Sequence, residues 1–271
     1  MSLALDYDWP ALREAWDRDG VVKLPAALNA AQLAETLAAY EWSLANPGPG
    51  ASRDRHTPEV TFYNDLFNPN ALTGYREMLQ RSPIPSYVAE LWRTPDVWFF
   101  YEQVFLKEGG EVRRTPWHQD SSYLAIDGQD LAVVWISFDR LSQADSLEFV
   151  KGSHHGILYN GSAFKPGDDT APLHRGSSLP RLPDIEGDRS GWDIVSWPVE
   201  PGDIIVFHPK VLHGGGATHG GMRRRTLTLR FFGDRSVYDP RDGGAGPPIK
   251  GFHQRMSAGA PFRDDSFLKL R

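Results

Sequence analysis

The stretch Thr115-Pro116-Trp117-His118-Gln119-Asp120 decides what kind of fold and site this chain is expected to have. Successive side chains of a β-strand point to opposite faces, so His118 and Asp120 would share one face. An imidazole and a carboxylate that converge in this way are two parts of a 2-His-1-carboxylate metal site, the usual ligand set of non-haem Fe(II) oxygenases. The third ligand must come from elsewhere in the chain.

Length and composition favour a globular protein. The chain has 271 residues, of which 40% are hydrophobic and 24% are charged, and this balance is typical of folded rather than disordered chains. A net charge of -6 argues against a nucleic acid as the main partner, because proteins that bind nucleic acids usually present a basic face. The absence of cysteine excludes disulfides, thiolate zinc sites and thiol nucleophiles.

Nothing in the sequence indicates a membrane segment or a secretion signal. The start, Met1-Ser2-Leu3-Ala4-Leu5-Asp6, lacks a basic stretch followed by an apolar run. No apolar run approaches the roughly 18 residues that cross a bilayer. We therefore expect a cytoplasmic protein with a small-molecule substrate and no membrane partner.

Helical patterns dominate roughly the first 95 residues. Helices are expected at 8–19, from the N-cap residue Asn29 to the Pro47-Gly48-Pro49-Gly50 stop, and at 84–93. A short strand is expected at 20–24. Residues 51–70 are polar and mixed, and we expect a loop that overhangs a pocket.

From residue 97 the hydrophobic period changes to two, which indicates strands. The expected strands are 97–107, 131–138, 147–150, 197–200, 203–207 and 223–232. Residues 160–192 and the tail from 239 are rich in Gly and Pro and irregular. Helices followed by many short strands predict a mainly β sandwich or barrel with helical packing on one side. We expect one domain over 1–271, with a helical part to about 95, a β core over about 96–235 and a tail over 236–271.

Two of the nine histidines, His208 and His213, remain as candidates for the third ligand. They follow an expected strand, whereas the other candidates lie in polar or irregular segments. Gly214-Gly215-Gly216 after His213 permits tight turning and close approach of the backbone to a ligand. The spacing alone leaves open a second interpretation, in which His213 faces solvent in a glycine turn.

The strand 223–232 adds a polar face beside these candidates. With a period of two, one face becomes apolar through Leu227, Leu229 and Phe231. The other face carries Arg224, Thr226, Thr228 and Arg230, a set that suits the lining of a polar pocket. An arginine there is able to hold a carboxylate through two hydrogen bonds, so a metal site beside it predicts a carboxylate co-substrate.

These residues resemble the phytanoyl-CoA dioxygenase family of Fe(II)/2-oxoglutarate-dependent oxygenases. The likeness rests on Thr115–Asp120, Leu147–His154, Pro201-Gly202-Asp203, His213-Gly214 and the arginine-rich strand, and it extends over roughly residues 8–235. The resemblance implies a double-stranded β-helix, or jelly-roll, core with flanking helices. It also implies Fe(II) bound by His118, Asp120 and His213, with 2-oxoglutarate and O2 in the three remaining positions.

The resemblance assigns further residues to the co-substrate. Arg224 matches the arginine that holds the distal carboxylate of 2-oxoglutarate, and Arg225 replaces it if the strand is bulged. Gln103 and Trp135 occupy places near the co-substrate in the family, although Trp135 is equally consistent with a plain core aromatic. Lys107 is also able to reach a carboxylate, but a surface position at the end of a strand suits it better. Relatives often carry polar residues after the distal histidine where this chain has Gly214–Thr218, so contacts there are expected from the backbone.

The implied reaction is hydroxylation of a small molecule with release of succinate and CO2. Related halogenases lack the carboxylate ligand, so Asp120 favours hydroxylation. A cupin-like metal-dependent isomerase or hydrolase and a non-catalytic jelly-roll binding module are the alternatives. The substrate rim is expected within 56–65 and 160–192. Phe62, Tyr63 and Arg140 are candidate contacts there, although packing or surface roles suit them better.

Overall fold

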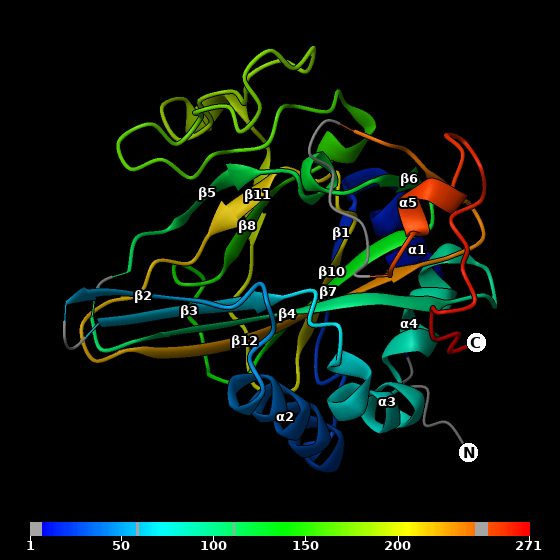
Figure 1. Cartoon of the computed structure of the whole chain (residues 1–271). Helices are drawn as coiled ribbons and strands as arrows, with labels where there is room; N and C mark the ends of the chain where they lie inside the picture. The colour runs from blue at the N-terminus through cyan, green and yellow to red at the C-terminus, as the bar shows by residue number, and fades with distance from the viewer. Residues whose placement is uncertain (1–6, 58–59, 111, 242–248) are drawn as a thin grey trace.

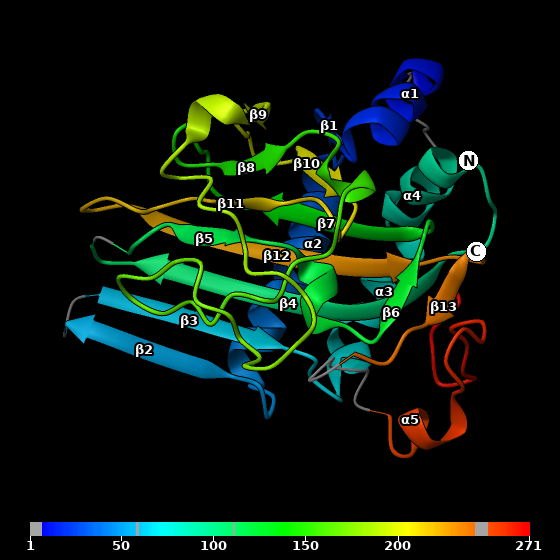
Figure 2. The same ribbon diagram turned by 90° about the horizontal axis from the view of Figure 1, so that it is seen from above.

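Two antiparallel β-sheets face each other and form the jelly-roll that the sequence predicts. The structure, a computed structural model, describes residues 7–57, 60–110, 112–241 and 249–271. In the larger sheet the strand order is β1 (Val21–Leu24), β10 (Ile204–Phe207), β7 (Leu131–Ser137), β12 (Arg223–Phe232), β4 (Trp98–Glu108), β3 (Val60–Leu66) and β2 (Ser52–Thr57). In the smaller sheet the order is β5 (Thr115–His118), β11 (His213–Gly215), β8 (Leu147–Val150) and β9 (Ile194–Ser196). Figure 2 shows the strands side by side.

Helices cover the outer face of the larger sheet, on the side away from the smaller one (Figure 1). They are α1 (Trp9–Asp19), α2 (Ala30–Ala45), α3 (Ala71–Arg81) and α4 (Ile84–Trp92), and a short α5 (Phe252–Arg255) lies in the tail. A capping box between Asn29 and Gln32 starts α2, as the N-cap preference of Asn predicts. The apolar face of β12, with Leu227, Leu229 and Phe231, packs into the core beneath these helices.

The remaining elements close one end of the barrel. A two-stranded ribbon pairs β13 (Ser236–Tyr238) with β6 (Ile126–Gly128). Tail residues Phe252, Phe262 and Phe267 pack with Phe100 and Phe232 in a second apolar cluster. Short 3-10 turns, η1 (Asp120–Tyr123), η2 (Ser153–His155) and η3 (Arg189–Gly191), complete the fold. Among the described residues, no helix combines the length and the apolar character needed to cross a membrane.

Two expectations about secondary structure are wrong, and one helix was missed. Residues 52–57 and 60–66 are strands, not a loop, because β3 pairs with the long strand β4 and β2 adds a polar edge. The helix α3 was not predicted. The strand expected at 197–200 lies instead at 194–196, and Val199 forms only an isolated bridge to Leu141. Pro198 has no N–H to donate to a continuous ladder, which explains the shift.

The irregular insertion expected at 160–192 is confirmed, because its described backbone contains only isolated bridges, turns and η3. It crosses above the smaller sheet, near β5 (Figure 2). The region up to about residue 95 supplies three strands of the larger sheet as well as four helices. That residues 1–271 form a single domain stays a prediction.

Candidate metal and co-substrate site

Three ligand atoms converge between the sheets, from His118, Asp120 and His213. His118 ends β5, Asp120 starts η1, and His213 begins β11, which pairs with β5 so that the two histidines are directly opposite. The Oδ1 atom of Asp120 lies 3.4 Å from Nε2 of His118 and 3.7 Å from Nε2 of His213. The donor atoms all lie within 4.8 Å of one another, so the three residues do come together, although Asp120 lies just beyond the end of β5 and not on the strand itself.

Backbone carbonyls orient both imidazole rings. Nδ1 of His118 donates to the carbonyl of Pro116 over 2.8 Å, and Nδ1 of His213 donates to the carbonyl of Val211 over 2.9 Å. A proton held on Nδ1 leaves the lone pair of Nε2 free, which is the tautomer that a metal requires. Burial and then the neighbouring His118 lower the pKa of His213 to about 3. The ring therefore stays neutral at ordinary pH.

Asp120 is ionised as well as buried. Burial by itself raises the pKa of the carboxyl, but the charge of Arg230 outweighs it and holds the pKa well below its usual range. Two histidines and one carboxylate are the ligand set that suits non-haem Fe(II). The residues present therefore fit this metal.

The polar face of β12 lines the pocket beside the triad. Arg224, Thr226, Thr228 and Arg230 are each 6% exposed or less. The intervening Leu227, Leu229 and Phe231 lie in the apolar core under the helices, which confirms the predicted alternation. Arg225 points to the opposite face, where it donates to both carboxylate oxygens of Asp139. The strand has no bulge near this point, since the register with β4 is regular from Arg223 to Arg230. Arg224, and not Arg225, therefore faces the pocket.

Arg224 is buried without a carboxylate partner among the described residues. Its Nη1 donates to the carbonyls of Gly216 at 2.6 Å and Asp145 at 3.1 Å. Its guanidinium carbon lies 5.5 Å from the ring centre of Trp135, a cation–π contact. A Cβ atom on Gly216, where φ is +74°, would collide with this guanidinium. The glycine run therefore makes room for the arginine.

The prediction that Lys107 lies at the surface is wrong, because the side chain is buried. It is 6% exposed, and its Nζ donates to the carbonyl of Gly216 over 3.2 Å. Burial first, and then the charges of Arg224 and Arg113, lower its pKa to about 7. In the described part of the chain both Lys107 and Arg224 donate to backbone carbonyls, and neither forms a salt bridge. Two buried cations without a carboxylate fit the distal carboxylate of 2-oxoglutarate.

Gln103 and Trp135 both face the pocket, but Gln103 is already engaged by protein groups. Its Oε1 accepts a hydrogen bond from Arg230 at 2.9 Å, and its Nε2 donates to Oδ1 of Asn64 at 3.0 Å. Its predicted contact with the co-substrate stays a prediction. The sequence did not predict the contact of Arg230 with Asp120 or the membership of Asn64 in the site. Arg230 was already on the predicted polar face, so its parity with Arg224 was an available signal.

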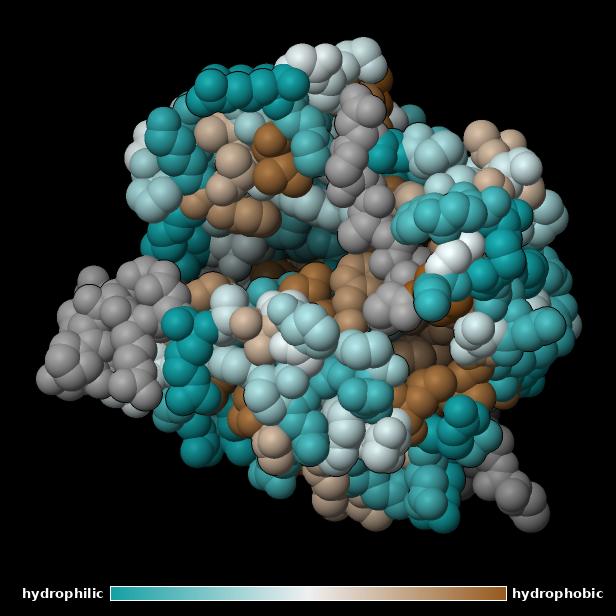
Figure 3. All heavy atoms as spheres, in the orientation of Figure 1, coloured by the Kyte–Doolittle hydropathy of each residue, from teal (hydrophilic) through white to brown (hydrophobic). Residues whose placement is uncertain are grey.

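The insertion covers the mouth of the pocket. The ring centre of Phe164 lies 5.3 Å from that of His118 and 6.2 Å from that of Tyr123. The surface is hollowed between the insertion and the larger sheet (Figure 3). Phe62 stacks on Phe105 near the Lys107 ammonium. Tyr63 instead packs into the core under the helices.

Arg140 is exposed and pairs with Glu200. It therefore has the surface role that the sequence analysis favoured.

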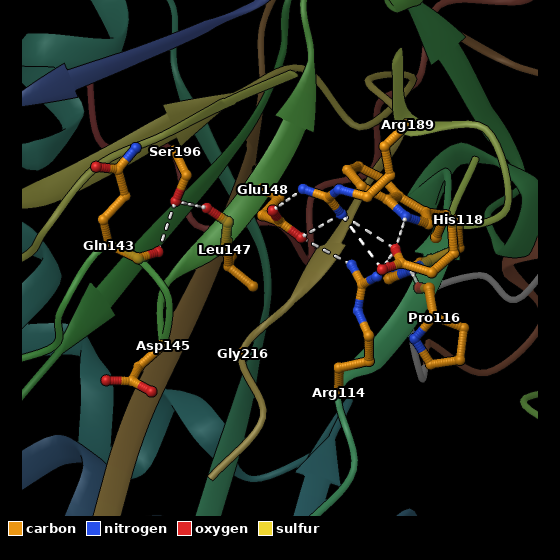
Figure 4. Close-up of polar contacts among 12 residues, drawn as sticks. Arg114, Pro116, His118, Gln143, Asp145, Leu147, Glu148, Arg189, Ser196 and Gly216 are labelled. Atoms are coloured by element: carbon orange, nitrogen blue, oxygen red, sulfur yellow. Dashed lines mark hydrogen bonds and ion pairs between the residues drawn. The ribbon is translucent and has the colours of Figure 1, made fainter. Parts of the chain in front are cut away.

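An ion-pair network fastens the end of the insertion to the smaller sheet (Figure 4). Glu148 on β8 accepts hydrogen bonds from Arg114 at 2.8 Å and from Arg189 of η3. Arg114 also pairs with Glu186, which accepts a hydrogen bond from the Trp117 indole at 3.0 Å. Trp117 thus points away from the metal ligands, as the strand alternation predicts.

The sequence profile of phytanoyl-CoA dioxygenase (PhyH) matches residues 16–226. This chain belongs to the phytanoyl-CoA dioxygenase family. It is 27% identical to a probable alpha-ketoglutarate-dependent hypophosphite dioxygenase of Stutzerimonas stutzeri. That alignment of 116 residues covers 42% of this chain and 38% of the relative. It is also 25% identical to L-proline trans-4-hydroxylase of Streptomyces griseoviridis. That alignment of 233 residues covers 80% of this chain and 83% of the relative.

Family membership agrees with the fold and the donor set. Three of the curated relatives are matched over only 38 to 46% of their own length. The solved structure of the epimerase SnoN with Fe3+, alpha ketoglutarate and nogalamycin RO is 21% identical, with a TM-score of 0.68 over 97% of this chain and 98% of that chain. At this identity the likeness shows the jelly-roll fold and no more.

Proposed function

We propose that this chain is an Fe(II)- and 2-oxoglutarate-dependent dioxygenase that hydroxylates a small molecule and releases succinate and CO2. One observation carries the proposal: a two-histidine, one-carboxylate ligand set shares a buried pocket with two cations, Arg224 and Lys107, that form no ion pair with a carboxylate of the described residues. The names of two relatives, a hypophosphite dioxygenase and a proline hydroxylase, support the same reaction class.

The metal ligands in this proposal are His118, Asp120 and His213. When bound together, Fe(II) and 2-oxoglutarate supply the oxidising chemistry, in which O2 is consumed and one oxygen atom is inserted into a substrate C–H bond. The protein holds the ligand atoms in place through the carbonyls of Pro116 and Val211. It thereby fixes the tautomer of both imidazoles before a metal arrives.

Arg224 and Lys107 hold the distal carboxylate of 2-oxoglutarate in this proposal. Their buried charges attract a carboxylate strongly because little water screens them. Trp135 supports the guanidinium of Arg224 from one side. Phe164 and Tyr123 on the other side of the pocket exclude water from the reacting centre.

The alternatives lose support on the same grounds. A cupin-like isomerase or hydrolase needs a metal but has no need for two buried cations beside it. A non-catalytic jelly-roll module has no need for a complete ligand set with both Nε2 atoms free. Oxygenase chemistry uses all of these features together.

The test uses purified apoprotein supplied with Fe(II), ascorbate and 2-oxoglutarate. We expect slow succinate formation without a substrate, and a rise in melting temperature when 2-oxoglutarate is added anaerobically to the Fe(II)-loaded protein. A screen of small metabolites for faster succinate release then identifies the substrate, and mass analysis of the product distinguishes hydroxylation from desaturation or ring formation. Absence of both succinate and the melting shift would contradict the proposal.

A further inference from the structure

Arg230 is the charged residue nearest to the metal ligands that the proposed reaction leaves without a role. It lies on the polar face of β12 and is 6% exposed. Its Nε and Nη2 atoms both donate to the same oxygen of Asp120, Oδ2, over 3.2 and 2.7 Å. This is a charge-assisted double contact on one carboxylate oxygen, a geometry more specific than a loose ion pair.

The two carboxylate oxygens of Asp120 therefore have different neighbours. Oδ1 faces the free Nε2 atoms of His118 and His213, at 3.4 and 3.7 Å. Oδ2 is occupied by the guanidinium. Carboxylates bind metals through one oxygen or through both, and two charged N–H donors on Oδ2 compete with its coordination to a metal.

We propose that Arg230 is a positioning residue that restricts Asp120 to metal binding through Oδ1 alone. The inference rests on the proposed function and deepens it. A metal with three protein donor atoms keeps three positions free, two for 2-oxoglutarate and one for O2. If Oδ2 also bound the metal, the position for O2 would be lost once 2-oxoglutarate was in place.

The surroundings of Arg230 hold its guanidinium in the required plane. Nη2 also donates to Oε1 of Gln103, whose Nε2 donates to Oδ1 of Asn64. The guanidinium carbon lies 4.5 Å from the ring centre of Tyr101. The hydrogen-bonded chain thus crosses three neighbouring strands, β3, β4 and β12, before it reaches Asp120. An arginine held this way resists rotation away from Oδ2.

A purely structural salt bridge would leave the number of free metal positions unchanged, so the test must count them. Nitric oxide serves as a stand-in for O2, because it binds Fe(II) at a free position and gives a characteristic electron paramagnetic resonance signal. Wild type, Arg230→Gln, Arg230→Lys and Gln103→Leu are loaded anaerobically with Fe(II). Each is titrated with nitric oxide, first alone and then with saturating 2-oxoglutarate.

We expect wild type to bind nitric oxide in both states. Arg230→Gln should bind it without 2-oxoglutarate but lose at least about tenfold in nitric oxide affinity once 2-oxoglutarate is bound, which is roughly 1.4 kcal/mol. Arg230→Lys keeps a charged donor for Oδ2 and should recover part of this affinity. Gln103→Leu, which loosens the guanidinium but keeps it, should fall between wild type and Arg230→Gln.

Arg225→Gln is the matched control, because it removes an arginine–aspartate pair from the other face of the same strand. It should leave the ternary nitric oxide affinity at the wild-type value, whatever its melting temperature. An unchanged ternary affinity in Arg230→Gln overturns the inference. If that variant does not fold, the same affinity in Arg230→Lys and Gln103→Leu as in wild type overturns it. Failure of wild type itself to bind Fe(II) and nitric oxide contradicts the proposed function instead.

Discussion

The two ends of the polar pocket differ in how their charges are balanced. At the metal end, Asp120 is paired with Arg230, and both imidazoles donate to backbone carbonyls. At the other end, Arg224 and Lys107 lie together against the carbonyl of Gly216, and neither forms an ion pair with a carboxylate of the described residues. Both ends are buried to a similar extent.

This difference shows which end is complete before ligands bind. Burying an uncompensated charge is costly, and the depressed pKa values of Lys107 and Arg224, about 7 and about 10, express that cost. The metal end shows the opposite trend, since the pKa of Asp120 is held well below its usual range. We infer that the metal end is preorganised, whereas the co-substrate end gains its balance from 2-oxoglutarate.

The largest loss of activity is expected from removing a ligand residue at the metal end. Asp120→Ala removes the carboxylate ligand and leaves the charge of Arg230 buried without its partner. Changing a residue that merely supports a ligand costs about 10- to 100-fold in metal affinity or activity, so loss of the ligand itself should exceed that range and abolish coupled hydroxylation. Succinate release and Fe(II) binding by equilibrium dialysis measure the two effects.

Asp139→Ala is the control for this variant, because it removes an aspartate that is paired with Arg225 outside the pocket. It should keep Fe(II) affinity near the wild-type value. Coupled turnover by Asp120→Ala at a rate near that of wild type would show that Asp120 is not a metal ligand.

A smaller effect is expected at the co-substrate end. Arg224→Ala should raise the KM for 2-oxoglutarate with little change in Fe(II) affinity, because the residue lies away from the ligand atoms. Truncating one partner of a buried charge pair costs about 2–5 kcal/mol, and Lys107 remains to hold the carboxylate. We therefore expect the lower end of this range, a rise of roughly 30-fold.

Arg225→Ala is the comparison variant, and it should leave the KM for 2-oxoglutarate unchanged because its side chain pairs with Asp139 on the opposite face. If Arg224→Ala keeps the wild-type KM, the carboxylate is held by another cation.

The parts of the site that follow from local spacing were predictable from the sequence. His118 ends a strand and Asp120 follows two residues later, and Arg224 shares a face with Thr226 and Thr228 by simple alternation. The jelly-roll followed from the strand pattern and the family resemblance together. The third ligand, His213, needed the resemblance as well, since a glycine turn is equally consistent with an exposed histidine.

The parts that depend on pairing between distant segments were not predictable. Asn64 reaches Gln103 only because β3 joins the larger sheet beside β4. The contact of Arg230 with Asp120 joins residues 110 positions apart. Lys107 is typical of an exposed strand end in sequence terms, yet the segment after His213 folds over it. Burial of this kind depends on tertiary packing, which no local pattern reports.

The smallest effect is expected in the pH dependence of 2-oxoglutarate binding. This dependence reports on the contribution of Lys107 alone. In the free protein burial lowers the pKa of Lys107 to about 7, and a bound carboxylate must raise it. The favourable contribution of Lys107 is complete below pH 7 and is lost as the pH rises through the pKa of the complex. The dissociation constant of 2-oxoglutarate should therefore rise above pH 7, by up to about tenfold per pH unit.

Lys107→Met should remove this pH dependence and weaken 2-oxoglutarate binding mainly at pH 6.5. It should also raise the melting temperature of the apoprotein at that pH, because the folded wild type must bury a charge that the unfolded chain exposes to water. Lys151→Met removes a lysine that pairs with Asp193 outside the pocket and should show neither change. A pH profile in Lys107→Met identical to that of wild type would assign the titration to another group. The two cations of the co-substrate end would then not act together.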